Sequence, residues 1–213
     1  MQTTLHYVFD PLCGWCYGAS ATLAAIAAAG TVRLGLLPSG LFQGPGARAM
    51  DDGFAAYAWS NDQRIERLSG QIFSPCYRDE VLANREQRFD SGPATLALTA
   101  VHQTAPEREM EALKAIQQAR YVEGRDITRT DVLAEVLQAL GLSAAAQALQ
   151  GPRETLVSAA DARIAEAQAL MRRFGARGVP SFVLEDEGRQ QLVHASAVYS
   201  DPRAFMAQLQ AVA

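Results

Sequence analysis

The stretch Asp10-Pro11-Leu12-Cys13-Gly14-Trp15-Cys16 decides how the rest of the chain is interpreted. The apolar run 5–9 precedes it and the alanine-rich run 17–29 follows it, an order that predicts a strand and then a helix. Cys13 would then lie at the helix N-terminus, where free backbone N–H groups stabilise a thiolate. Cys16 would lie one turn further, close enough to resolve a mixed disulfide formed on Cys13. The stretch therefore predicts a thiol–disulfide oxidoreductase.

Two other interpretations of the cysteine pair are weaker. Half of a zinc site would need two more ligands, and none of the remaining candidates is paired at ligand spacing; these are Cys76, His6, His102 and His194. We therefore expect no metal. A pair of inert core cysteines is disfavoured because a helix N-terminus is a place where thiols become reactive.

Length and composition limit the class of protein. The chain has 213 residues, enough for one large domain or two modest ones. Hydrophobic residues make up 49% of the chain and charged residues 20%, which is the ordinary composition of a globular protein. The net charge of −4 argues against nucleic-acid and anionic-membrane partners. No run of about 18 apolar residues predicts a membrane span, and residues 1–9 do not resemble a secretory signal. Three cysteines exclude a disulfide framework, so we expect a cytoplasmic protein.

The first forty residues predict a βαβ unit. Residues 3–9 have the pattern of a buried strand, residues 16–29 that of an alanine-rich helix, and residues 31–37 that of a second strand. Gly30 fits the left-handed position that follows a helix. The crossover should be right-handed, with parallel strands.

Helical patterns then dominate until strand patterns return near the C-terminus. Residues 48–174 are almost wholly helical in pattern, and Thr128-Arg129-Thr130-Asp131 is typical of a capping box. The runs 179–184 and 191–195 predict a β-hairpin. Asp201-Pro202 should cap a final helix. The predicted order is βαβ, a helical block, and αββα.

This order, with Cys13-Gly14-Trp15-Cys16 after the first strand and Gly178-Val179-Pro180 before the third, resembles the thioredoxin superfamily. The helical block is similar to that of the DsbA-like branch, and Asp10–Gly18 resembles cytosolic members described as predicted protein-disulfide isomerases. The resemblance implies an α/β thioredoxin-like fold with a large all-helical insertion. The implied domains are a discontinuous thioredoxin-like domain at 1–40 and 166–213 and a helical insertion domain at 41–165.

The resemblance also implies roles for individual residues. Cys13 would attack and Cys16 would resolve, while Val179 and a cis Pro180 would face the dithiol and bind substrate. Trp15 would contact substrate or shield the sulfurs. We expect no cofactor beyond the redox-active disulfide, and glutathione is left open as a co-substrate. The partners would be protein or small-molecule disulfides and thiols, with a homodimer left open.

One position departs from the family pattern. Many relatives place a buried acid six residues before the first cysteine, where this chain has Tyr7. The nearest acid is Asp10, which is a candidate proton acceptor or a helix cap.

The helical block offers further candidates. It should shape a groove over the dithiol, with Phe42, Phe54, Tyr57 and Trp59 as lining residues or as core. Cys76 is expected to be a lone buried or half-exposed thiol.

Two other functions stay open at this point. One is a glutathione-dependent isomerase or transferase of the hydroxychromene carboxylate isomerase or kappa-class type, whose members share this architecture. These typically carry a single serine where Cys13 stands, so the cysteine pair disfavours them. The other is a non-catalytic binding module on a thioredoxin frame.

Overall fold

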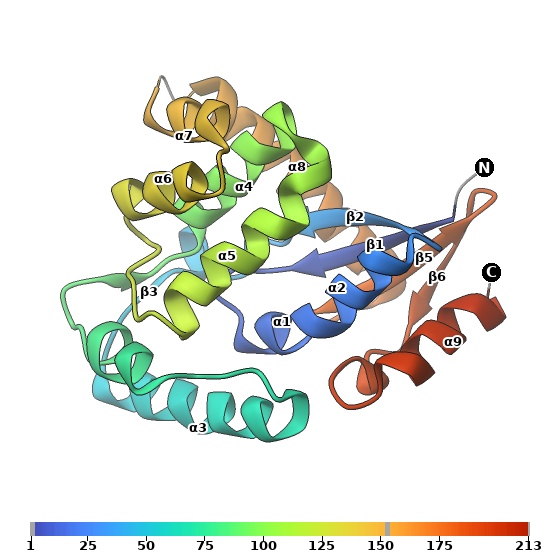
Figure 1. Cartoon of the computed structure of the whole chain (residues 1–213), viewed down its shortest axis with the longest axis horizontal. Helices are drawn as coiled ribbons and strands as arrows, with labels where there is room; N and C mark the ends of the chain where they lie inside the picture. Colours follow the sequence, from blue (N-terminus) through green and yellow to red (C-terminus); the bar gives the residue numbers. More distant parts are fainter. Residues whose placement is uncertain (1–2, 152–153, 213) are drawn as a thin grey trace.

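A four-stranded sheet runs through the computed structural model, which describes residues 3–151 and 154–212. Its spatial order is β2-β1-β5-β6, with β1 parallel to β2 and antiparallel to β5, and β5 antiparallel to β6 (Figure 1). The strands are β1 (Thr4–Phe9), β2 (Arg33–Pro38), β5 (Ser181–Asp186) and β6 (Arg189–Val193). The predicted order of βαβ, helices and αββα is confirmed.

The two faces of β1 are buried under different helices, because alternate residues of a strand point to opposite faces. One face packs into the main core with α2 (Ser20–Ala29) and α9 (Pro202–Val212), and its β1 members are Leu5, Tyr7 and Phe9. On the other face Val8 packs with Ala167 of α8 (Glu154–Phe174). Burial on both sides makes β1 the rigid centre from which the dithiol stretch emerges.

The helical stretch after β1 is two helices rather than the one predicted for 16–29. The helix α1 (Gly14–Gly18) is followed at Ala19 by α2, so helical structure begins two residues earlier than expected. Cys13 precedes α1 with extended backbone, φ −84° and ψ 116°. Gly30 ends α2 with φ 62°, as predicted.

The middle of the chain is mainly helical, as predicted, but a small two-stranded ribbon interrupts it. The ribbon pairs β3 (Arg48–Ala49) with β4 (Arg88–Phe89). The helices are α3 (Asp52–Ser69), the π-helix η2 (Tyr77–Leu82), α4 (Gly92–Thr104), α5 (Glu109–Tyr121), α6 (Thr130–Ala139) and α7 (Ser143–Gln150). No helix within the described residues has the length and apolar character that crossing a membrane requires.

The predicted capping box at 128–131 is wrong, although a helix does begin there. The residue before α6 is Arg129, which makes no side-chain capping bond. The Thr128 hydroxyl instead donates to Asp126 Oδ1 at 2.6 Å. Thr128 therefore lies one position before the residue that caps α6, and its N–H and hydroxyl both donate to Asp126. At the C-terminal end the Asp201 side chain does cap α9, accepting from the Ala204 N–H at 2.9 Å.

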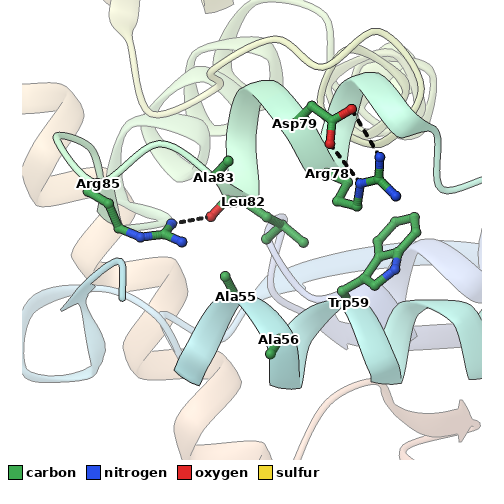
Figure 2. A pocket seen from close by; sticks show the side chains of 8 residues that line it. All are labelled: Ala55, Ala56, Trp59, Arg78, Asp79, Leu82, Ala83 and Arg85. Atoms are coloured by element: carbon green, nitrogen blue, oxygen red, sulfur yellow. Dashed lines mark hydrogen bonds and ion pairs between the residues drawn. The ribbon is translucent and has the colours of Figure 1, made fainter. Parts of the chain in front are cut away.

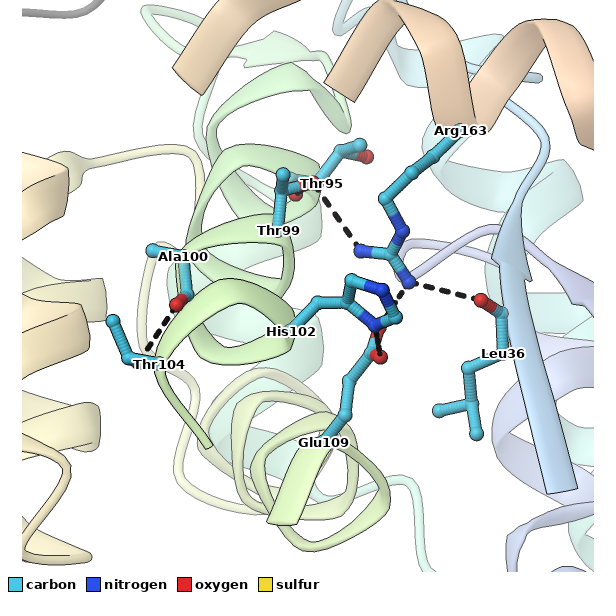
Figure 3. A network of polar contacts seen from close by, with 8 residues as sticks. All are labelled: Leu36, Thr95, Thr99, Ala100, His102, Thr104, Glu109 and Arg163. Atoms are coloured by element: carbon cyan, nitrogen blue, oxygen red, sulfur yellow. Dashed lines mark hydrogen bonds and ion pairs between the residues drawn. The ribbon is translucent and has the colours of Figure 1, made fainter. Parts of the chain in front are cut away.

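A buried ion pair fastens the helical block to the sheet. Arg163 of α8 donates to the Glu109 carboxylate of α5 and, at 2.9 Å, to the Leu36 carbonyl of β2 (Figure 3). It also reaches Thr99 of α4 at 3.3 Å, while His102 lies 2.8 Å from the second Glu109 oxygen. One guanidinium thus connects three helices and an edge strand.

We expect Glu109→Gln to lower the free energy of unfolding by about 3–5 kcal/mol, because Arg163 would stay buried without its counter-charge. Urea unfolding measures this change. The matched control is Glu111→Gln on the same helix, which breaks the surface pair with Arg108 and should cost far less. Equal losses in the two variants would contradict a dominant role for the buried pair.

Candidate functional site

Cys13 lies where β1 ends and α1 begins, at the floor of a pocket. Its N–H donates to the Asp10 carbonyl at 3.0 Å, which closes the turn between strand and helix. Its thiol lies 3.7 Å from the Val179 carbonyl, 166 residues away in sequence. The side chain is 7% exposed. Its small exposed part lies at a pocket that Leu12, Gly14 and Trp15 also line.

Cys16 lies one turn further along α1 and is fully buried. Burial raises the pKa of its thiol well above the usual range, and the hydrogen bond and charge of Cys13 raise it further. The Asp10 backbone N–H opposes this shift. Cys16 is therefore a protonated, shielded thiol beside an accessible one, which is the asymmetry that an attacking and a resolving cysteine need.

Val179 and Pro180 lie against the first of these cysteines. The peptide bond between them is cis, and they directly precede β5. Because Val8 of β1 pairs with Ser181 of β5, the end of β1 and the start of β5 lie side by side. The structure thus brings Val179 and Pro180 together with the dithiol.

Asp10 lies beneath the site with its carboxylate fully bonded within the protein. It accepts from the Leu12 N–H at 2.9 Å, the Phe42 N–H at 3.1 Å and the Ser91 hydroxyl at 2.8 Å. Burial raises the pKa of Asp10, and these hydrogen bonds oppose that shift. The carboxylate holds the turn before Cys13 and anchors the helical block to it; its role as proton acceptor stays a prediction.

Tyr7 lies on β1, six residues before Cys13. It is fully buried, and its hydroxyl donates to the Cys16 carbonyl at 3.1 Å. Burial raises the pKa of this phenol well above its usual range, so Tyr7 is neutral. Tyr7 is therefore a neutral packing and hydrogen-bonding group next to the second cysteine.

An apolar pocket of ≈ 200 Å³ opens directly above Cys13. Its aromatic walls are Phe42, Phe54, Tyr57, Tyr77, Phe89 and Tyr121. Of the four aromatic residues suggested as groove lining, three line this pocket. The fourth, Trp59, lies instead in a separate pocket between α3 and η2, beside Arg78 (Figure 2).

Trp15 forms one wall of the apolar pocket. Its ring lies edge-on to Tyr199 with 5.2 Å between centroids, and the Arg64 guanidinium lies 5.7 Å from the indole. These contacts on two sides hold the ring beside Cys13. Trp15 can therefore both shield the sulfur and present an aromatic edge to a substrate.

Asp62 of α3 is a site residue that the sequence analysis missed. Its carboxyl lines the same pocket as Cys13, is 5% exposed, and accepts from the Tyr77 hydroxyl at 2.9 Å. Burial raises the pKa of Asp62 to about 7, against the opposing effects of Tyr77 and Arg120. The local sequence Asn61-Asp62-Gln63-Arg64 looks like a solvated helix face, so no local signal marked it.

Arg120 places a positive charge behind the pocket wall. It is 1% exposed, and its guanidinium lies 5.2–5.6 Å from the ring centroids of Tyr77, Phe89 and Tyr121. The Tyr121 hydroxyl in turn donates to the Leu12 carbonyl at 2.8 Å, next to Cys13. The aromatic rings thus separate this cation from the pocket interior while fixing the turn that carries the thiol.

Metal binding finds no support in the side-chain arrangement. Among residues 3–151 and 154–212, no three His, Cys, Asp or Glu side chains come together as a ligand set. Cys76, predicted to be buried or half-exposed, is an exposed free thiol at the start of η2.

Asp62 should make stability depend on pH in a specific direction. Its pKa is about 7 in the folded protein and 3.8 in a model peptide, so the carboxyl stays protonated to a higher pH in the folded state than in the unfolded state. The wild-type free energy of unfolding should therefore fall as pH rises from about 4 to 7, relative to Asp62→Asn, which cannot titrate. Urea unfolding of both proteins at three pH values tests this. A difference that stays constant with pH would contradict it.

Comparison with known proteins identifies the family of the chain. The family model described as DSBA-like thioredoxin domain matches residues 4–200. No curated protein sequence matches the chain.

Solved structures give closer relatives. The cytosolic disulfide reductase DsbM from Pseudomonas aeruginosa is 35% identical, with 98% of each chain covered and a TM-score of 0.82. The structure of the same reductase with GSH gives 36% identity and the same coverage and TM-score. A protein from Nitrosomonas europaea, described as a putative protein disulfide isomerase, is 20% identical over 99% of this chain and 97% of its own, with a TM-score of 0.80, and shows the shared fold. The chain belongs to the DSBA-like thioredoxin domain family, and it is a protein-disulfide oxidoreductase of the DsbA-like class.

Proposed function

We propose that the chain is a cytosolic reductase of disulfides that uses Cys13 and Cys16 and is recycled by glutathione. The observation that carries the proposal is the position of the Cys13 thiol, at a helix N-terminus and 3.7 Å from the Val179 carbonyl, with buried Cys16 one turn away. The relative DsbM, described as a cytosolic disulfide reductase and also solved with GSH, supports the direction, the compartment and the reductant.

In the first step the Cys13 thiolate attacks one sulfur of the substrate disulfide. A bond forms between Cys13 Sγ and that sulfur, the substrate S–S bond breaks, and the other half leaves as a thiolate. The Val179 carbonyl and the Trp15 ring hold the substrate chain or small molecule at the mouth of the pocket.

In the second step Cys16 attacks Cys13 Sγ and releases the remaining thiol. The Cys13 side chain is one of the causes that raise the pKa of Cys16. Formation of the mixed disulfide removes the negative charge of Cys13. The pKa of Cys16 therefore falls at the step in which Cys16 must lose its proton. Two glutathione molecules then reduce the Cys13–Cys16 disulfide and leave as glutathione disulfide, so the cycle transfers two electrons.

Alkylation of the reduced native protein should separate the three thiols. We expect iodoacetamide at neutral pH to modify exposed Cys76 first, then Cys13, which is 7% exposed, and Cys16 last, because Cys16 is fully buried and has a raised pKa. Peptide mass spectrometry measures each rate, and unfolded protein, in which all three should react, is the control. Equal rates at Cys13 and Cys16 in the folded protein would contradict the assigned roles.

A glutathione redox titration tests the function directly. We expect Cys13 and Cys16 to form a disulfide with a potential between about −270 and −200 mV, the range of thioredoxin and glutaredoxins. A potential near about −120 mV would indicate an oxidant instead. Cys13→Ser should abolish turnover, and Cys16→Ser should accumulate the mixed disulfide. If Cys16→Ser turns over like the wild type, a glutathione-dependent isomerase or transferase replaces this proposal.

A further inference from the structure

We propose that the Asp62 carboxyl group donates the proton to the substrate thiolate that leaves when Cys13 attacks a disulfide. This inference rests on the proposed reductase function and names the group that completes its first step. A leaving thiolate of high pKa departs slowly unless it is protonated, so an acid beside the nucleophile accelerates the reaction.

The geometry places this acid at the attacking residue. Asp62 and Cys13 line the same pocket, and Asp62 Oδ1 lies so close to Gly14 that a Cβ there would come within 2.3 Å of it. Gly14 directly follows Cys13. A glycine at this position is therefore what lets the carboxyl approach the first turn of α1, while the Tyr77 hydroxyl holds the other oxygen, Oδ2, at 2.9 Å.

Burial keeps Asp62 available as an acid near neutral pH. Tyr77 of η2 donates to it. Other titratable groups nearby are Arg120 and Tyr121 of α5, Tyr57 of α3 and the Cys13 thiol. Burial outweighs the hydrogen bond and the cation, and the pKa of Asp62 is about 7. A general acid works best when its pKa lies near the operating pH.

The proton and electron balance closes without another reactant. Attack by the Cys13 thiolate breaks the substrate S–S bond, and the proton of Asp62 passes to the departing sulfur. Resolution by Cys16 releases the second thiol, whose proton comes from Cys16. The two sulfurs of the enzyme supply both electrons, and Asp62 regains its proton from solvent.

The test compares two disulfides that differ in how much their leaving group needs a proton. Reduced protein is mixed with hydroxyethyl disulfide, which releases an alkyl thiol of high pKa, or with dithiobis(nitrobenzoate), which releases an aryl thiolate that is stable without a proton. Single-turnover rates isolate the first step from recycling by glutathione. The variant is Asp62→Asn, which keeps an oxygen acceptor for Tyr77, and the control is Glu66→Gln, one turn further along α3 and outside the pocket.

We expect Asp62→Asn to slow reduction of the alkyl disulfide by roughly 10²-fold, in line with loss of a general acid. The rate of reduction of the aryl disulfide should stay within about twofold of the wild-type rate. Glu66→Gln should change neither rate. If Asp62 has a purely structural role, Asp62→Asn should slow reduction of both disulfides alike, and that result would overturn the inference. If wild-type protein reduces neither disulfide, the proposed function itself fails.

The pH profile gives a second readout. With the alkyl disulfide, the wild-type rate should fall as pH rises through an apparent pKa near 7. This falling limb of the pH profile should be absent in Asp62→Asn and absent with the aryl disulfide. Tyr77→Phe removes a hydrogen bond that lowers the pKa of Asp62, so the limb should move to higher pH. A limb that stays in place in Tyr77→Phe, or persists in Asp62→Asn, would overturn the inference.

Discussion

The antiparallel pairing of β1 with β5 is the constraint on which the site depends. Val8 and Ser181 lie opposite each other, so the chain leaving β1 and the chain entering β5 meet at one end of the two central strands. That meeting brings the Cys13 thiol to the Val179 carbonyl across 166 residues of sequence. Since β1 is buried on both faces, neither partner can shift without disturbing the core.

A second constraint joins the helical block to the same turn. The Asp10 carboxylate accepts hydrogen bonds from the loop at Phe42 and from Ser91 before α4, while the Tyr121 hydroxyl of α5 donates to Leu12. Three distant segments therefore fix the residues that precede Cys13. The helical block is more than a cover over the dithiol, because its own polar groups define the geometry of the thiol-bearing turn.

Much of the fold and of the dithiol could be predicted because its signals are local. The strand at 4–9, the left-handed Gly30 and the Asp201 cap each depend on residues within a few positions. The predicted capping box at 128–131 is wrong although its signal is also local, because the Thr128 hydroxyl donates to Asp126 instead. The sequence pattern did not show that the helix begins one residue later, with Arg129 as the capping position.

The sequence by itself determined the cysteine pair and its setting between a strand and a helix, since both follow from adjacent residues. Only the tertiary structure decided which charged side chains leave water. Asp62 and Arg120 lie on helices with ordinary polar sequences, and they are buried because η2 and the pocket aromatics pack around them. Burial of a charge depends on residues far away in the chain, and the sequence around the charged residue does not show which residues will cover it.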